Sequence, residues 1–252
     1  MILLLDIGNT RIKWAGLIGG EFQPGGALPR GDGDVRCVID AVQAKQYGPT
    51  RVVVSNVAQD GYREQLQSEV ATIWGCQVEF VATSAAVFGV VNGYDEPCSL
   101  GVDRWLALIA ARQLLDGALC IVDCGTALTV DLLSAGGVHL GGMIVPGVSL
   151  MQGALLNNTE GLNVLNEWQA GDEMQFMMRN TADAISGGAC YTAVALIDRV
   201  LSDAQTKLGA EVSLVLTGGD AEMLKPHLQG KSLFEPDLVL KGVAMVAGAA
   251  NR

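Results

Sequence analysis

The chain has 252 residues, half of them hydrophobic, and a net charge of −11 at pH 7. Its length is enough for one large domain or two smaller ones, each with its own core. Its acidity, with no basic patch or stripe along the sequence, excludes the usual binders of nucleic acid and of anionic membranes.

Neither a membrane segment nor a zinc cluster is indicated. No run of about 18 uncharged apolar residues occurs, and the first residues lack the basic start and the apolar length of a signal peptide. The six cysteines have no regular spacing and there are only two histidines. We therefore expect reduced thiols, no zinc site and a cytoplasmic location.

Strand-like and helical segments alternate along the chain. Apolar spacing predicts strands at 51–57, 77–82 and 212–220, the last running into a glycine turn, and helices at 34–46, 60–73, 103–115, 181–208 and 238–250. The segment 157–180 has no clear helical phase. This alternation predicts an α/β architecture with buried sheets.

A strand–acid–glycine–strand pattern occurs twice in the chain. The stretch "LLLDIGNTRIKW" begins at residue 3 and "CIVDCGTALTVD" at residue 120. At an offset of 117 residues, Asp6 matches Asp123 and Gly8 matches Gly125. The pattern therefore indicates an internal duplication.

Each copy continues into a second strand and then a Gly-Gly pair, at 19–20 and at 136–137. Such pairs are typical of tight turns between antiparallel strands. Chance is the alternative, because the chain has 32 glycines, but the matched glycines occur in matched strand contexts. We predict two halves, 1–116 and 117–252.

The first turn, "DIGNT" at 6–10, has the composition of a phosphate-binding loop. Gly8 allows the backbone to approach a ligand, and successive amides can point at phosphate oxygens. Asn9 and Thr10 add short polar side chains, while Arg11 and Lys13 lie on one face of the next strand. The alternative is a hairpin turn without a ligand, which commonly has these residues.

The acid that precedes each turn suggests a role for a cation. Asp6, at the end of a strand, suits a hydrated Mg²⁺, which prefers one or two carboxylates and several waters. The second turn, 123–126, favours ligand binding, since two such loops on either side of a cleft could clamp a polyphosphate. The two common phosphate loops, G-x-x-x-x-G-K-[ST] and G-x-G-x-x-G, do not occur. This combination resembles the acetate and sugar kinase, Hsp70 and actin superfamily.

A third segment, 92–115, has the features of a phosphoryl-acceptor site. Asp103 and Arg104 lie where a helix is predicted to begin, and Tyr94 lies upstream in a loop with glycine and proline. A carboxylate can accept a proton from a substrate hydroxyl, and a neighbouring guanidinium can hold a carboxylate. The alternative for Asp103 is a residue that caps the helix and stabilises its dipole.

Five motifs together resemble the type III pantothenate kinases. They are D-x-G-N-T at 6–10, G-V-D-R at 101–104, D-x-G-T-A-x-T-x-D at 123–131, G-G-x-I-x-P-G at 141–147 and T-G-G-D at 217–220. They occur in that family's order over nearly the whole chain, and the second and fourth point to this family within the superfamily. The resemblance implies duplicated ribonuclease H-like domains, the actin-like ATPase fold, with a cleft between them.

The resemblance also implies an enzyme that uses ATP with Mg²⁺ to phosphorylate pantothenate to 4'-phosphopantothenate, the first step of coenzyme A biosynthesis. It assigns ATP to Asp6, Ile7, Gly8, Asn9, Thr10, Arg11, Ile12, Lys13 and Thr126. It assigns pantothenate to Tyr94, Gly101, Val102, Asp103, Arg104 and Thr181. Asp103 matches the acceptor of the hydroxyl proton, and Asp123 matches a ligand of a monovalent cation, K⁺ or NH₄⁺.

Alternatives remain at this point. The chain could be another small-molecule kinase with a different acceptor pocket, or a non-catalytic nucleotide-binding regulator, which the carboxylate at 103 disfavours. Family members form homodimers, and the apolar helical stretch 189–201 could pack against its copy or cover the sheet. Thr181 could be a plain helix N-cap.

Other polar and aromatic residues have structural interpretations. We expect Trp14 and Trp105 in the core and His139 as a structural histidine with a satisfied hydrogen bond. Asp131 either contacts water on Mg²⁺ or closes a hydrogen-bond network. Asp220 is expected to cap the helix that follows it.

Overall fold

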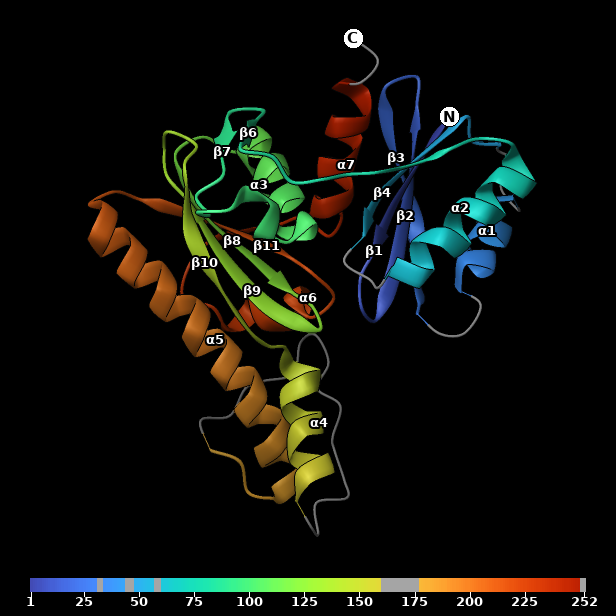
Figure 1. Ribbon diagram of the computed structural model, residues 1–252. Helices are drawn as coiled ribbons and strands as arrows, with labels where there is room; N and C mark the ends of the chain where they lie inside the picture. Colours follow the sequence, from blue (N-terminus) through green and yellow to red (C-terminus); the bar gives the residue numbers. More distant parts are fainter. Residues whose placement is uncertain (31–33, 44–47, 57–59, 160–176, 250–252) are drawn as a thin grey trace. The chain divides into compact units, whose positions relative to one another are not determined.

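The computed structural model describes residues 1–30, 34–43, 48–56, 60–159 and 177–249 of the chain. They form two compact units, the first made of Met1–Ala110 with Asp237–Arg252 and the second of Ala111–Pro236 (Figure 1). The predicted second half, 117–252, includes the last helix, whereas the contacts of this helix group it with the first unit.

The first unit contains a five-stranded sheet in the order β3-β2-β1-β4-β5. Its strands are β1 (Ile2–Ile7), β2 (Arg11–Ile18), β3 (Glu21–Pro29), β4 (Arg51–Asn56) and β5 (Val78–Phe80). β1 runs antiparallel to β2 and parallel to β4. Both β1 and β4 are nearly continuous apolar runs, as strands buried on both faces require.

Helices cover both faces of this sheet. On one face, Leu5 and Val54 share a core cluster with residues of α1 (Asp34–Gln43) and α2 (Asp60–Trp74). Because successive side chains of a strand alternate, Leu4 and Val53 face the other way. α7 (Leu238–Ala249) packs against β1 and β4 and lies on the side of the sheet away from α1 and α2 (Figure 1).

The second unit repeats the same sheet. Its strands are β8 (Ala118–Cys124), β9 (Ala127–Leu133), β10 (His139–Pro146), β11 (Val212–Thr217) and β12 (Ser232–Phe234), in the order β10-β9-β8-β11-β12. β8 runs antiparallel to β9 and parallel to β11, so each strand has its counterpart in the first sheet. The predicted α/β architecture with a repeated strand–turn–strand device is confirmed.

The two Gly-Gly pairs make different turns. Gly19 (φ 62°) and Gly20 (φ 92°) are both left-handed, which is what a two-residue type I′ hairpin requires. In the second pair Gly137 is left-handed (φ 80°), and its amide donates to the carbonyl of Ser134 in a longer turn. The pairs thus match in position but not in turn type.

α5 (Thr181–Leu208) is the long helix of the second unit and packs against α4 (Val148–Asn158). Among the described residues, it alone is long and apolar enough to cross a membrane, and half of its most apolar window is buried. Cys190, Ala193 and Ile197 lie in the unit's core cluster with β8, β9 and β11. The apolar stretch 189–201 therefore covers the sheet, which was one of the two alternatives.

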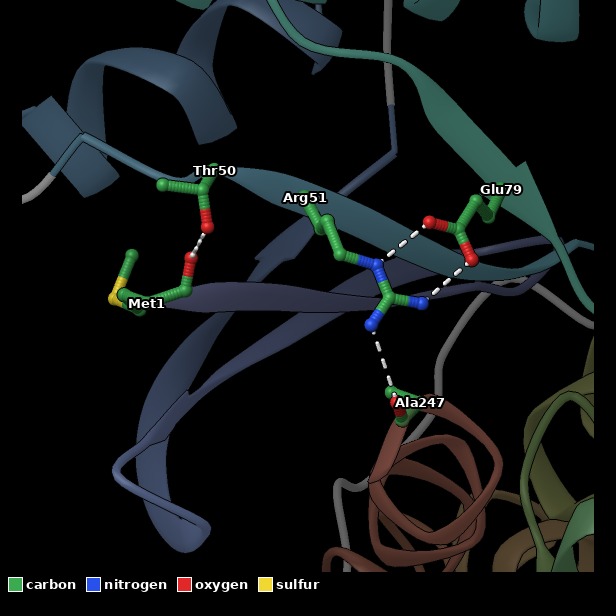
Figure 2. A network of polar contacts seen from close by, with 5 residues as sticks. All are labelled: Met1, Thr50, Arg51, Glu79 and Ala247. Atoms are coloured by element: carbon green, nitrogen blue, oxygen red, sulfur yellow. Dashed lines mark hydrogen bonds and ion pairs between the residues drawn. The ribbon is translucent and has the colours of Figure 1, made fainter. Parts of the chain in front are cut away.

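Thr50 and Arg51, at the start of β4, form hydrogen bonds with Met1 and with the last helix, α7 (Figure 2). The Nε and Nη2 atoms of Arg51 each donate to a carboxylate oxygen of Glu79 on β5 (2.7 Å), and Nη1 donates to the carbonyl of Ala247 on α7 (3.3 Å). The hydrogen bonds from Arg51 lower the pKa of Glu79 and raise that of Arg51. Thr50 donates to the carbonyl of Met1 through its amide (3.0 Å) and its hydroxyl (3.3 Å).

Candidate functional site

The first predicted loop joins β1 to β2. The amide of Gly8 donates to the carbonyl of Arg11 (3.0 Å) and closes the turn, while the side chains of Asn9, Thr10 and Arg11 are exposed. The two isoleucines that flank the turn, Ile7 and Ile12, are each only 1% exposed and belong to the core. Any contact of these two isoleucines with a nucleotide would therefore come from their backbone.

Arg30 supports this loop and was not among the predicted site residues. Its amide donates to the carbonyl of Thr10 (2.8 Å) and its Nη1 to the carbonyl of Gly8 (3.3 Å). The guanidinium also lies 5.2 Å from the centroid of the Tyr62 ring. With Arg11 and Lys13, Arg30 places three cations at or beside the turn, which favours an anionic ligand.

The surroundings of Asp6 test whether Mg²⁺ fits. Asp6 is opposite Lys13 on β2 and beside Ser55 on β4. Ser55 is fully buried, and its hydroxyl has no hydrogen-bond partner among the described residues. Nowhere in the described ranges do three or more His, Cys, Asp or Glu side chains gather as a metal cluster. An ion at Asp6 would have few protein ligands, which suits Mg²⁺ with water and phosphate and does not suit a structural zinc.

The second loop, 123–126, is the meeting point of three predicted motifs in the second unit. The amide of Gly147 donates to the carbonyl of Thr126 (2.9 Å), and that of Asp220 donates to the carbonyl of Cys124 (2.9 Å). A Cβ at Gly147 would overlap the carbonyl oxygen of Gly125. Gly147 is therefore required by close backbone approach, and the motifs at 141–147 and 217–220 enclose the loop.

Gly218 makes a second close approach to the same loop. It has a φ of 94°, and a Cβ there would lie 2.5 Å from the Oδ1 of Asp123. Burial raises the pKa of the Cys124 thiol, and the charges of Asp123 and Asp220 raise it further. Two carboxylates therefore lie near one buried thiol. A cation bound by Asp123 would reduce this negative charge, and the carboxylate and carbonyl oxygens present suit a hard cation such as K⁺.

The predicted acceptor residues lie close together in the first unit, at the start of α3 (Val102–Leu114). Arg104 is 6% exposed, and its Nη1 donates to the hydroxyl of Tyr94 (2.8 Å). The Oδ1 of Asp103 accepts from the amide of Arg104 (2.8 Å). A Cβ at Gly101 would lie 2.6 Å from that Oδ1. The G-V-D-R motif is thus one compact group with Tyr94.

Asn92, which was not among the predicted site residues, holds the loop that carries Tyr94. It is 8% exposed, its Nδ2 donates to the carbonyls of Ser84 (3.3 Å) and Pro97 (3.1 Å), and its Oδ1 accepts from the amide of Tyr94 (3.0 Å). The segment between these carbonyls contains the short hairpin β6 (Ala86–Val87) and β7 (Val90–Val91) and ends at the 3₁₀ turn η1 (Pro97–Ser99). A buried amide that satisfies three backbone groups fixes this loop.

The alternative of a helix N-cap at Thr181 is wrong, and the cap predicted at Asp220 is confirmed in position only. α5 begins at Thr181, but its N-cap is Asn180, whose Oδ1 accepts from the amide of Asp183 (2.9 Å). Thr181 is instead the first helical residue, and it is exposed. Asp220 occupies the N-cap position of α6 (Ala221–Leu224) without a side-chain capping bond.

The expected structural residues are buried. The Nε2 of His139 lies 2.9 Å from the Oδ1 of Asp131, and both side chains are inaccessible to solvent or nearly so. This pairing favours the hydrogen-bond network over an ion contact for Asp131. Trp14 is 8% and Trp105 1% exposed, as core residues are.

The first unit thus contains two separate groups of predicted residues: those of the first loop, and the acceptor residues with Tyr94 at the start of α3. Asp123, Thr126 and Thr181 belong to the second unit. Within it, Asp123 and Thr126 share one loop, whereas Thr181 stands at the start of α5.

The family model and the relatives of known name that match this chain all indicate one family. A family model described as type III pantothenate kinase matches residues 2–203. The protein named type III pantothenate kinase from Nitrosococcus oceani is 44% identical over 253 residues, covering 98% of this chain and 94% of the relative. That from Thiobacillus denitrificans is 37% identical over 250 residues, covering 99% and 98%.

Solved structures share the fold at lower identity. A conserved putative Baf family transcriptional activator from Campylobacter jejuni superposes with a TM-score of 0.61 at 22% identity, covering 99% of this chain and 98% of the other. The activator of 2-hydroxyisocaproyl-CoA dehydratase from Clostridium difficile, with bound ADPNP, gives a TM-score of 0.54 at 12% identity, covering 99% and 94%. At such identities these likenesses concern the fold alone.

Proposed function

The chain belongs to the type III pantothenate kinases, and from that premise we propose which of its residues carry the reaction. Members phosphorylate a hydroxyl of pantothenate with ATP, which begins coenzyme A biosynthesis. The residue roles below are our assignment for this chain.

Pantothenate binds at the start of α3, where Arg104 holds its carboxylate. The observation that carries this assignment is the buried guanidinium of Arg104, which is oriented by the hydroxyl of Tyr94 at 2.8 Å. A guanidinium fixed in this way presents a planar fork that fits a carboxylate. Gly101 and Val102 form the wall beside it, and Thr181 is a further contact to pantothenate.

Asp103 accepts the proton of the attacking hydroxyl. It is next to Arg104 in sequence and lies in the first turn of α3, so a substrate held by Arg104 has this carboxylate nearby. As the hydroxyl oxygen forms its bond to the γ-phosphorus, its O–H bond breaks and the proton moves to Asp103, while ADP leaves.

ATP is bound by the first loop, Asp6 to Lys13, and by Thr126 of the second loop. Backbone amides and the cations Arg11, Lys13 and Arg30 support phosphate binding at the first loop. Asp6 would hold Mg²⁺, directly or through water, and the ion would neutralise part of the charge of the phosphates. We also propose a cytoplasmic enzyme that binds no nucleic acid, supported by six free cysteines and the acidic composition.

Replacing Arg104 tests the pantothenate site. In Arg104→Lys one charge remains but the planar fork is lost, so we expect the KM for pantothenate to rise about ten- to a hundredfold, the equivalent of about 1.5–3 kcal/mol for a hydrogen bond to a charged group. The affinity for ATP should not change. Arg112→Lys, on the same helix, is the matched control, since Arg112 donates to the backbone carbonyls of Gly117 and Ala135. An unchanged KM in Arg104→Lys would remove Arg104 from the pantothenate site.

A monovalent cation at Asp123 is expected to be needed for activity. Asp123 and Asp220 place negative charge beside the second loop, and K⁺ or NH₄⁺ there would reduce repulsion of the triphosphate. Turnover should therefore depend on K⁺ or NH₄⁺, and Asp123→Ala should lose that dependence together with most activity. Asp203→Ala, at an exposed ion pair with Arg199 on α5, is the control. Equal rates in sodium, potassium and ammonium buffers would rule out the cation site.

We further propose a homodimer formed through the second unit. Large apolar side chains are exposed there on β10, α4 and α5: Met143 (51%), Ile144 (62%), Leu150 (47%), Leu155 (46%) and Tyr191 (51%). α4 contacts both β10 and α5, and large exposed apolar side chains on neighbouring elements are typical of a subunit interface.

Light scattering at micromolar concentration should give the mass of a dimer, and Ile144→Asp should give a monomer, because the interface would bury a charge. Ile18→Asp, at an exposed apolar residue of the first unit, should remain dimeric. A monomeric wild-type protein would show that this surface does not pair two copies.

A further inference from the structure

The last helix of the chain meets the helix that carries the proposed acceptor residues. α7 and α3 touch at Gly242, which is buried. A Cβ at Gly242 would overlap the carbonyl oxygen of Leu106 and would lie 2.8 Å from its carbonyl carbon and 2.9 Å from its Cβ. The two helices are therefore in contact at the level of their backbones, and no side chain larger than hydrogen fits between them.

The contact lies one turn away from the acceptor residues. Leu106 follows Asp103 by three residues on α3 and is itself fully buried. A helix rises about 1.5 Å per residue, so the point of contact is about 4.5 Å along the axis from Asp103. Displacing α3 at Leu106 would move the first turn of the same rigid helix.

α7 is held in place on its other sides. It packs against β1 and β4 of the first sheet, and the buried residues along it include Leu238, Val239 and Val243. Near its end, the carbonyl of Ala247 accepts from Arg51, whose other two nitrogens are fixed by Glu79 (Figure 2). α7 is thus a rigid support between the sheet and α3.

We propose that Gly242 is a positioning residue for phosphoryl transfer: through the backbone contact of α7 with α3 it sets the place of Asp103 and Arg104. This inference rests on the proposed role of Asp103. A methyl group at position 242 must push α3 away from α7, because the atoms it meets are the backbone carbonyl and the Cβ of Leu106, which cannot rotate aside. A displacement of about 1 Å of a catalytic group can cost about a hundredfold in rate.

The test compares Gly242→Ala with Gly248→Ala. Both glycines are on α7, but a Cβ at Gly248 meets nothing within 4 Å. In Gly242→Ala we expect kcat per ATP-binding molecule to fall about ten- to a hundredfold, while the dissociation constant for ATP stays unchanged. Gly248→Ala should keep the wild-type kcat. Molecules are counted by ATP-binding stoichiometry, so that loss of folded protein does not count as loss of rate.

A merely structural role of Gly242 would lower the melting temperature and leave kcat per binding molecule unchanged, and that result would overturn the proposal.

If Gly242→Ala does not fold, Arg51→Met takes its place, because it releases the end of α7 without adding an atom at the crossing. We then expect kcat to fall with ATP affinity unchanged, relative to the exposed control Arg199→Met on α5; an unchanged kcat overturns the proposal. Failure of the proposed acceptor role would be seen separately, as normal turnover in Asp103→Asn.

Discussion

Asp103→Asn is expected to lower kcat by about 10²–10⁴-fold, the usual contribution of a positioned general base. An asparagine has nearly the same shape and can still accept the hydrogen bond from the amide of Arg104, which Asp103 accepts at 2.8 Å. It cannot take the proton of the substrate hydroxyl. Calorimetry should therefore find nearly unchanged affinities for pantothenate and ATP, while turnover measurements find the loss.

Asp116→Asn is a suitable control for this variant. Asp116 is exposed and follows the end of α3 by two residues, so it changes the net charge equally without touching the acceptor group. We expect wild-type turnover from it. Near-normal turnover in Asp103→Asn would instead make Asp103 a first-turn residue of α3 that stabilises the helix dipole and nothing more.

Gly8→Val and Gly125→Val are expected to weaken ATP binding. A Cβ at Gly8 would lie 3.3 Å from the carbonyl oxygen of Arg11, and one at Gly125 would lie 3.4 Å from the Oδ1 of Asp123, and neither glycine is left-handed. The fold should therefore accept both substitutions with small adjustments. The branched side chain would occupy the space in which the backbone meets phosphate. Loss of one hydrogen bond to a charged group costs about 1.5–3 kcal/mol, or about ten- to a hundredfold in affinity.

These glycine variants need a folded-state control and a ligand control. Gly136→Val is a matched turn variant, because a Cβ there meets only the hydroxyl of Ser134 at 3.9 Å; it should bind ATP normally. Pantothenate should still bind to both loop variants, since Arg104 and Tyr94 are unchanged. A folded Gly125→Val that binds ATP with wild-type affinity would reduce the second loop to a turn.

The features that could be predicted from the sequence were those that depend on residues close together in the chain. The repeat at an offset of 117 was visible because an acid and a glycine follow a buried strand in both halves, and the structure has two sheets of one strand order. The helices predicted at 60–73, 103–115 and 181–208 agree with α2, α3 and α5 within one residue at each end. The part of the predicted helix 34–46 at 44–46 and the last residue of the predicted strand 51–57 lie outside the described residues.

The features that could not be predicted depend on contacts between distant residues. Arg30 follows the first loop by twenty residues and reaches it because β3 returns beside β2. Asn92 is one of many polar residues in a loop until its three backbone partners are known. Gly242 is one of two glycines in an apolar helix, and its role depends on Leu106, which is 136 positions earlier. Hydrophobic periodicity contains none of this information.

Transfer of phosphate from ATP to pantothenate can be tested by identifying the reaction product. The purified protein would be supplied with ATP, Mg²⁺ and K⁺ together with pantothenate, or with sugars and small carboxylic acids of similar size, and the products analysed by ³¹P NMR and mass spectrometry. We expect ADP and a single phosphate monoester, 4'-phosphopantothenate, with no ester formed on the other acceptors. Phosphorylation of a sugar or acid but not of pantothenate, or ATP binding with no acceptor phosphorylated at all, would contradict this expectation.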